Sequence, residues 1–93
     1  MFKTLEELIS TIRQRKGSKI EESYTKKLLN DKNLNIEKAK EEIAELIDAI
    51  EKNTNKVHEA ADVLYHLMVL LEANDIKIED VMDELKKRKN ELR

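Results

Sequence analysis

The sequence predicts a small all-α domain of four main helices and one short helical turn. Alanine, glutamate, lysine, leucine and arginine make up 50 of the 93 residues, a composition typical of helical chains. One glycine and no proline leave few residues for the turns of a strand-rich fold. The hydrophobic residues, 40% of the chain, recur at helical spacing, which indicates a folded chain rather than a disordered one.

The length predicts a single domain over residues 1–93. A chain of this size buries only about 60 to 65% of its unfolded surface, which leaves no room for a second core. The same limit predicts self-association, because a monomer has too little core to bury fully a helix that is apolar nearly all round.

The first half of the chain predicts one helix and one short turn. Thr4 and Glu7 have the spacing of a capping box, and apolar residues then recur at helical spacing as far as Gly17, which predicts a helix from about residue 5 to residue 16. Residues 17–35 lack a long period, although residues 24–29 have room for a helical turn or two.

The second half predicts three helices. Asn35 is a good N-cap, so a helix is expected after it as far as Asn53. Residues 56–73 are apolar nearly all round and predict the buried central helix. After residues 74–75 a last amphipathic helix is expected, with an apolar face of Ile78, Val81, Met82, Leu85 and Leu92.

Composition also limits partners and location. A net charge of −2 gives no attraction to nucleic acid or to an anionic membrane, so neither is an expected partner. The first residues contain no apolar signal core and the longest apolar run, residues 63–71, is too short for a bilayer, so a cytoplasmic location is expected. Without cysteine, a metal would need oxygen or histidine ligands, which favours a hard cation.

Two pairs of carboxylates stand out. Glu59, Asp62 and His66 share one stripe of the predicted central helix, at i, i+3 and i+7. Carboxylates one turn apart repel each other in an apolar setting, so they take up protons or need a cation between them. Glu42 and Glu45 have the same spacing on the preceding helix. A short connection makes the two helices antiparallel neighbours, so both pairs are predicted to converge on one cleft.

Four carboxylates suit Mg²⁺, which prefers hard oxygen ligands. The pair on the preceding helix also has a simpler interpretation, since glutamates three residues apart are common in a chain with 14 glutamates and mostly face solvent. That interpretation does not extend to the central helix, where acids are seldom buried unpaired. Three interpretations of His66 are open: a metal ligand, an acid–base group, or a core histidine bonded to a neighbouring helix. The core interpretation is favoured because Mg²⁺ rarely takes imidazole, and His58 is expected to be exposed.

Three stretches resemble signature motifs of the phosphoribosyl-ATP pyrophosphohydrolase family. They are Ser-Tyr-Thr-Lys-Lys-Leu-Leu at 23–29, Lys-Ala-Lys-Glu-Glu-Ile-Ala-Glu at 38–45 and Glu-Ala-Ala-Asp-Val-Leu-Tyr-His-Leu at 59–67. The Glu-x-x-Glu and Glu-x-x-Asp core is shared with the wider all-α MazG-type nucleoside triphosphate pyrophosphohydrolases. The Ser-Tyr-Thr and Ala-Asp-x-Leu-Tyr-His motifs point to the narrower family.

The resemblance implies an enzyme of histidine biosynthesis that uses Mg²⁺ to hydrolyse the α–β phosphoanhydride of phosphoribosyl-ATP, giving phosphoribosyl-AMP and pyrophosphate. It also implies an obligate homo-oligomer, usually a dimer, whose helices complete a four-helix-bundle core. The positions that match the family's metal ligands are Glu42, Glu45, Glu59 and Asp62. Lys38 matches a basic residue of the family pattern, whereas Lys40 and Ile43 stand where glycine and alanine are usual.

Several side chains are candidates for handling substrate. The segment of hydroxyl and ammonium groups that could wrap phosphates consists of Ser23, Tyr24, Thr25, Lys26 and Lys27. Lys38 joins the two lysines of that segment as a group that could neutralise charge on departing pyrophosphate. Glu41, or one of the four carboxylates that the metal does not fully engage, could take the proton of the attacking water.

Two other functions stay open from the sequence. The first is a house-cleaning pyrophosphohydrolase that acts on free or modified nucleotides, because the carboxylate core is the same. The second is a non-catalytic helical module that dimerises through its first and last helices. That module gives no reason for acids on the apolar helix.

Overall fold

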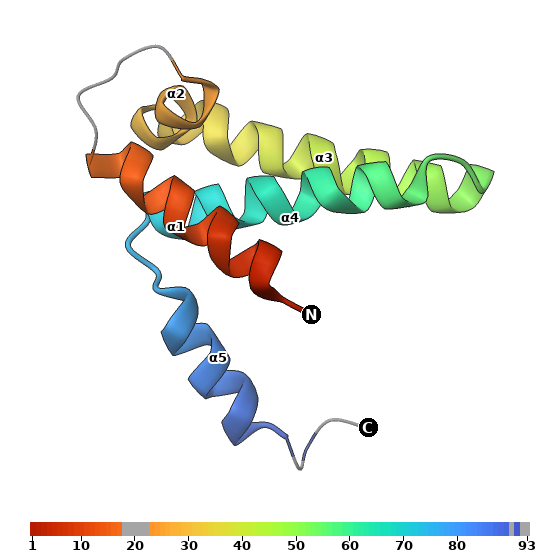
Figure 1. The fold of residues 1–93 in the computed structure, drawn as a ribbon. Helices are drawn as coiled ribbons and strands as arrows, with labels where there is room; N and C mark the ends of the chain where they lie inside the picture. The colour runs from red at the N-terminus through yellow and green to blue at the C-terminus, as the bar shows by residue number, and fades with distance from the viewer. Residues whose placement is uncertain (18–22, 90, 92–93) are drawn as a thin grey trace.

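The computed structural model describes residues 1–17, 23–89 and 91, and these residues form five helices and no strand (Figure 1). The helices are α1 (Lys3–Gly17), α2 (Tyr24–Asn30), α3 (Lys32–Lys52), α4 (Lys56–Ala73) and α5 (Ile78–Lys87). The expected all-α fold is confirmed, and α2 is the expected short turn. None of the described helices is both long enough and apolar enough to cross a membrane.

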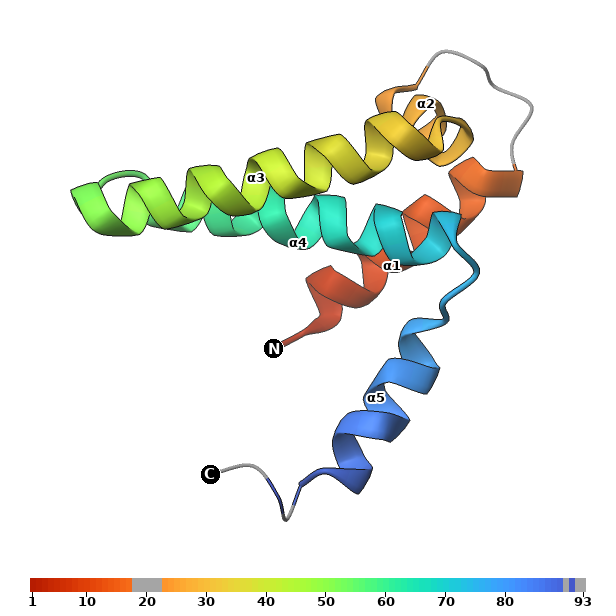
Figure 2. The same ribbon diagram turned by 180° about the vertical axis from the view of Figure 1, so that it is seen from behind.

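The helices α3 and α4 form a long antiparallel hairpin that is the scaffold of the molecule (Figures 1 and 2). Asn53 ends α3 in the left-handed conformation with φ of 56°, and its N–H donates to the carbonyls of Ala49 and Ile50. Asn55, with φ of 48°, precedes α4. Asparagine tolerates this backbone region better than most residues. The expected short connection is therefore present, and it sets α3 and α4 side by side.

The start of α3 differs from the prediction. Asp31 is the N-cap, and its carboxylate accepts a hydrogen bond from the N–H of Leu34 at 3.1 Å. Asn35, predicted as the cap, lies one turn inside the helix and is 1% exposed. The prediction failed because aspartate and asparagine are both good caps, so the sequence offered two starts.

The first helix also begins earlier than expected. It starts at Lys3, and the N–H of Glu6 donates to the carbonyl of Phe2 at 3.2 Å. Thr4 therefore lies within the helix, and the predicted capping-box start is wrong. The bounds of α4 match the prediction, whereas α5 ends at Lys87, and Leu92 lies outside the described residues.

The core forms where α1, α2 and α4 meet. Ile12, Leu28, Met68 and Val69 are its buried residues. The expected burial of α4 holds on one side only, because apolar side chains such as Leu64 remain exposed in the single chain. The hairpin thus has a packed end, under α1 and α2, and an open end.

A network of charges ties α5 to α1. The Arg13 guanidinium donates to Glu72 at 3.2 Å and to both carboxylate oxygens of Glu79 at 2.9 and 2.6 Å. These bonds hold the pKa of the Glu79 carboxyl at about 2. Lys16 adds a 2.7 Å bond to Asp75. Beyond this anchor α5 leads away from the hairpin (Figure 2).

Candidate metal centre

The structure places the two predicted carboxylate pairs opposite each other on α3 and α4. One oxygen atom from each of Glu42, Glu45 and Glu59 lies within 4.8 Å of the other two. Asp62 is linked to this cluster through Glu59, because one ligand atom from each of His58, Glu59 and Asp62 also lies within 4.8 Å of the other two. The local reason is helical spacing: residues three apart share a face, and the hairpin turns the two faces toward each other.

The centre gathers carboxylates whose oxygen atoms are in part buried without a hydrogen-bond partner. The Glu42 side chain is only 14% exposed, and its Oε2 atom has no hydrogen-bond partner, nor has Oε2 of Glu59. Burial raises the pKa of the Glu42 carboxyl, and the charges of Glu45 and Asp62 raise it further. Buried, unpaired carboxylate oxygens are what a divalent cation would satisfy, and an all-oxygen donor set fits Mg²⁺.

His66 borders the same centre. It is 5% exposed, as expected of a core histidine, and the rings of Tyr24 and Tyr65 lie nearly perpendicular to it, with centroids 5.9 and 5.0 Å away. Its Nε2 lies 3.8 Å from Oε1 of Glu42. Burial lowers the pKa of His66, which favours the neutral imidazole. The burial of His66 was predicted from the sequence, whereas its proximity to Glu42 was not.

Tyr24 and Lys38 lie on the α2 side of the carboxylates. Lys38 donates a 3.2 Å hydrogen bond to Glu41. Burial raises the pKa of the Tyr24 hydroxyl, and the charges of Lys38 and Glu42 act on the same hydroxyl. The Lys38 ammonium and the Tyr24 hydroxyl therefore lie next to the acidic cluster. There they could contact an anionic ligand of a bound metal.

The other members of the Ser-Tyr-Thr segment have partners within the fold. Ser23 caps α2 and accepts a 3.1 Å hydrogen bond from the N–H of Lys26. The hydroxyls of Thr25 and Tyr65 are hydrogen-bonded to each other. The Lys26 ammonium donates to the carbonyl of Lys16 at 3.2 Å, and Lys27 is exposed on α2. The segment thus secures α2 to α1 and α4, beside the centre.

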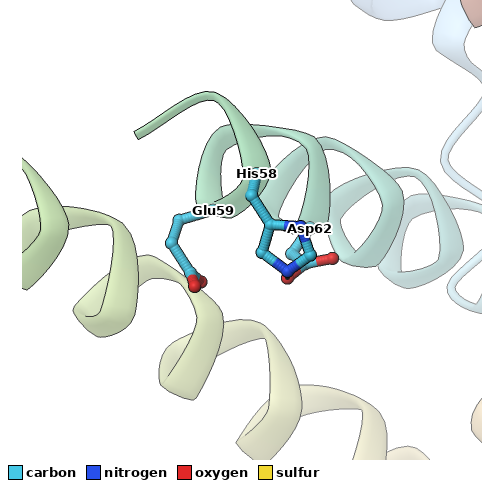
Figure 3. A group of neighbouring side chains, drawn as sticks. All are labelled: His58, Glu59 and Asp62. Carbon is cyan, nitrogen blue, oxygen red and sulfur yellow. The ribbon is translucent and has the colours of Figure 1, made fainter. Parts of the chain in front are cut away.

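His58 lies beside Asp62, a contact that was not predicted from the sequence. Its side chain is 74% exposed, as expected, and its Nε2 lies 3.4 Å from Oδ2 of Asp62. Figure 3 shows Glu59 pointing toward α3, with His58 and Asp62 together beside it. The i, i+4 spacing of His58 and Asp62 was the signal that could have found this pair.

An all-helical scaffold with Glu-x-x-Glu facing Glu-x-x-Asp resembles the all-α nucleotide pyrophosphohydrolases, and this is the class that the fold and the centre define. The family described as phosphoribosyl-ATP pyrophosphohydrolase matches residues 5–89. The chain belongs to this family of enzymes.

Curated relatives agree with the family match. The phosphoribosyl-ATP pyrophosphatase of Bacillus cereus (strain ATCC 14579) is 46% identical over 90 residues, covering 91% of this chain and 82% of the relative. The protein of the same name from Methanococcoides burtonii is 38% identical over 91 residues, covering 92% of each chain. The histidine biosynthesis bifunctional protein HisIE of Pyrococcus furiosus is 44% identical over 86 residues, covering 91% of this chain but only 41% of the relative.

Proposed function

We propose that this chain hydrolyses phosphoribosyl-ATP to phosphoribosyl-AMP and pyrophosphate, the second step of histidine biosynthesis, with Mg²⁺ bound by Glu42, Glu45, Glu59 and Asp62. The observation that carries the proposal is the convergence of carboxylates from α3 and α4, with buried oxygens that lack partners. The family match over residues 5–89 supports the choice of substrate. We also propose that the chain is a single domain over residues 1–93 and that it is cytoplasmic, and the biosynthetic name of one relative supports the location.

The proposed mechanism has three sets of residues: the metal ligands, the base for the attacking water, and the groups that stabilise the departing pyrophosphate. Glu42, Glu45, Glu59 and Asp62 would hold Mg²⁺, which when bound would supply positive charge to attract an anionic triphosphate to this acidic site and to polarise its phosphoanhydride. Glu41 belongs to neither ligand group and is exposed beside Lys38, so we assign it to take the proton of the attacking water. The water oxygen bonds to one of the two phosphorus atoms of the α–β phosphoanhydride, and the bond between that phosphorus and the bridging oxygen breaks.

Pyrophosphate leaves with developing negative charge, which nearby cations and hydroxyls stabilise. We assign this role first to Lys38 and Tyr24, because both lie beside the carboxylates. The segment of Ser23, Thr25, Lys26 and Lys27 is proposed to contact the phosphates through backbone and side-chain groups at the start of α2.

We also propose that two chains associate to complete a four-helix core. The support is an apolar stripe on α3, formed by Ile43, Ile47 and Ile50 at i, i+4 and i+7, which is exposed in the single chain together with Leu64 on α4. Sedimentation equilibrium is expected to give twice the 10.9 kDa mass of one chain. Ile47→Asp is expected to reduce the mass to one chain, and Ile76→Asp, off the stripe, is the control. A wild-type monomer contradicts the proposal.

The substrate is tested by measuring pyrophosphate release from phosphoribosyl-ATP, ATP and a set of deoxynucleoside triphosphates, with Mg²⁺ and with EDTA. We expect Mg²⁺-dependent turnover of phosphoribosyl-ATP alone. Turnover of the other nucleotides instead would assign the chain to the house-cleaning enzymes. Absence of any turnover would favour the non-catalytic helical module.

A further inference from the structure

We propose that His58 is a nitrogen ligand of the metal centre, and that this chain therefore binds first-row transition cations such as Zn²⁺ at a mixed nitrogen and oxygen face. The inference rests on the proposed function to the extent that it places a divalent cation among the same carboxylates. It adds a ligand and a class of cation that the four carboxylates do not supply.

The geometry that supports the inference lies in the first two turns of α4. His58, Glu59 and Asp62 each offer one ligand atom within 4.8 Å of the other two, and the His58 nitrogen is already 3.4 Å from an Asp62 oxygen. Donor atoms that share one cation at about 2.1 Å lie at most about 4 Å apart. Small side-chain rotations therefore suffice to bring the three atoms to bonding positions.

Glu59 connects this nitrogen-containing face to the all-oxygen face. It belongs both to the group with Glu42 and Glu45 and to the group with His58 and Asp62. Its Oε2 atom is buried without a hydrogen-bond partner. A carboxylate has two oxygens and can serve two neighbouring positions, so Glu59 can bind a cation at the His58 face with one oxygen while the other stays with the glutamates of α3.

Of the two histidines, only His58 has freedom to turn toward a cation at this face. Its ring is largely exposed, whereas the ring of His66 is buried between Tyr24 and Tyr65. Imidazole nitrogen suits Zn²⁺, Co²⁺ and Ni²⁺, whereas Mg²⁺ prefers oxygen. His58 should therefore raise the affinity for transition cations and leave Mg²⁺ binding nearly unchanged.

Isothermal titration calorimetry of the full chain with Zn²⁺, and separately with Mg²⁺, tests this selectivity. His58→Gln keeps a polar group that can donate to Asp62 but loses the imidazole. It is expected to lower Zn²⁺ affinity at least about tenfold, since even loss of an outer partner costs that much, and Mg²⁺ affinity by less than about twofold. Val57→Ala, a neighbouring exposed position, is the control and should leave both affinities unchanged.

A second readout is independent of affinity. Because the chain has two histidines, ¹⁵N-labelled histidine gives two sets of ring resonances, and His58→Gln assigns them. Zn²⁺ is expected to shift the ring nitrogens of His58 and not those of His66. Zn²⁺ that shifts neither ring, or an unchanged Zn²⁺ affinity in His58→Gln, overturns the inference.

Glu59→Gln separates failure of the inference from failure of the proposed metal centre. If Glu59→Gln loses affinity for both cations while His58→Gln keeps both, the carboxylate centre stands and His58 is not a ligand. If Glu59→Gln also keeps both affinities, the cations bind elsewhere, and the proposed centre falls together with the inference. Circular dichroism of each variant verifies that its helices are intact.

Discussion

Glu42→Gln is expected to slow pyrophosphate release at least about 100-fold and yet to raise the melting temperature of the metal-free protein at pH 7. The loss of activity follows from removing a proposed metal ligand. The gain in stability follows from the raised pKa of Glu42: ionising this buried carboxyl beside Glu45 and Asp62 costs free energy in the folded state, and glutamine does not ionise.

The pH dependence has a defined sign. A carboxyl whose folded pKa is raised destabilises the protein once the pH exceeds its unfolded pKa, about 4.3. The gain in Glu42→Gln should therefore shrink as the pH falls from the raised folded pKa toward that value, and it should vanish below it. Thermal unfolding in EDTA between pH 3 and pH 7 measures it. Glu51→Gln, an exposed position on the same helix, is the matched control. A melting temperature of Glu42→Gln below that of wild type at pH 7 would contradict the assignment of charge strain to this residue.

Magnesium is expected to raise the melting temperature of the wild-type protein by about 10 °C or more when its concentration is 100 times the Kd. Binding to the native state alone then adds about 2.7 kcal/mol to the free energy of unfolding, and for a domain of this size 1 kcal/mol corresponds to about 4–8 °C. Glu42→Ala should respond much less, because a ligand is missing.

Differential scanning calorimetry with increasing Mg²⁺ measures these shifts. The exposed-site variant Glu51→Gln should respond like the wild type, which controls for general screening of charge by the salt. An equal rise in wild type and Glu42→Ala would place the cation outside the carboxylate centre.

The helices could be predicted where one signal dominated. The apolar run and flanking asparagines of α4 fixed both of its ends, and the one-sided apolar pattern of α3 fixed its end at Asn53. The start of α3 could not be fixed, since Asp31 and Asn35 compete as caps and only tertiary packing buries Asn35. Partial burial of α4 is likewise a property of how few helices one chain can pack around it.

Spacing alone predicted which carboxylates would face each other, because two helical stripes and a short connection determine the geometry. The surroundings of His66 were beyond prediction. Its contacts with Tyr24 depend on how α2 packs against α4, and no local pattern encodes the docking of one helix on another. The proximity of His58 to Asp62 was predictable from their i, i+4 spacing, and it is compatible with the exposure expected of His58.

The α3–α4 hairpin also bears on how the molecule assembles. All four carboxylates lie on these two helices, and the chain between them is closed by a short loop, so bringing them together costs little loop entropy. The core around Ile12 and Leu28 instead joins parts of the chain that are distant in sequence. Contacts between residues that are close in sequence, such as those within the α3–α4 hairpin, form faster than contacts between distant parts of the chain. The α3–α4 half of the molecule, which carries the carboxylates, can therefore form before α1 and α5 are in place.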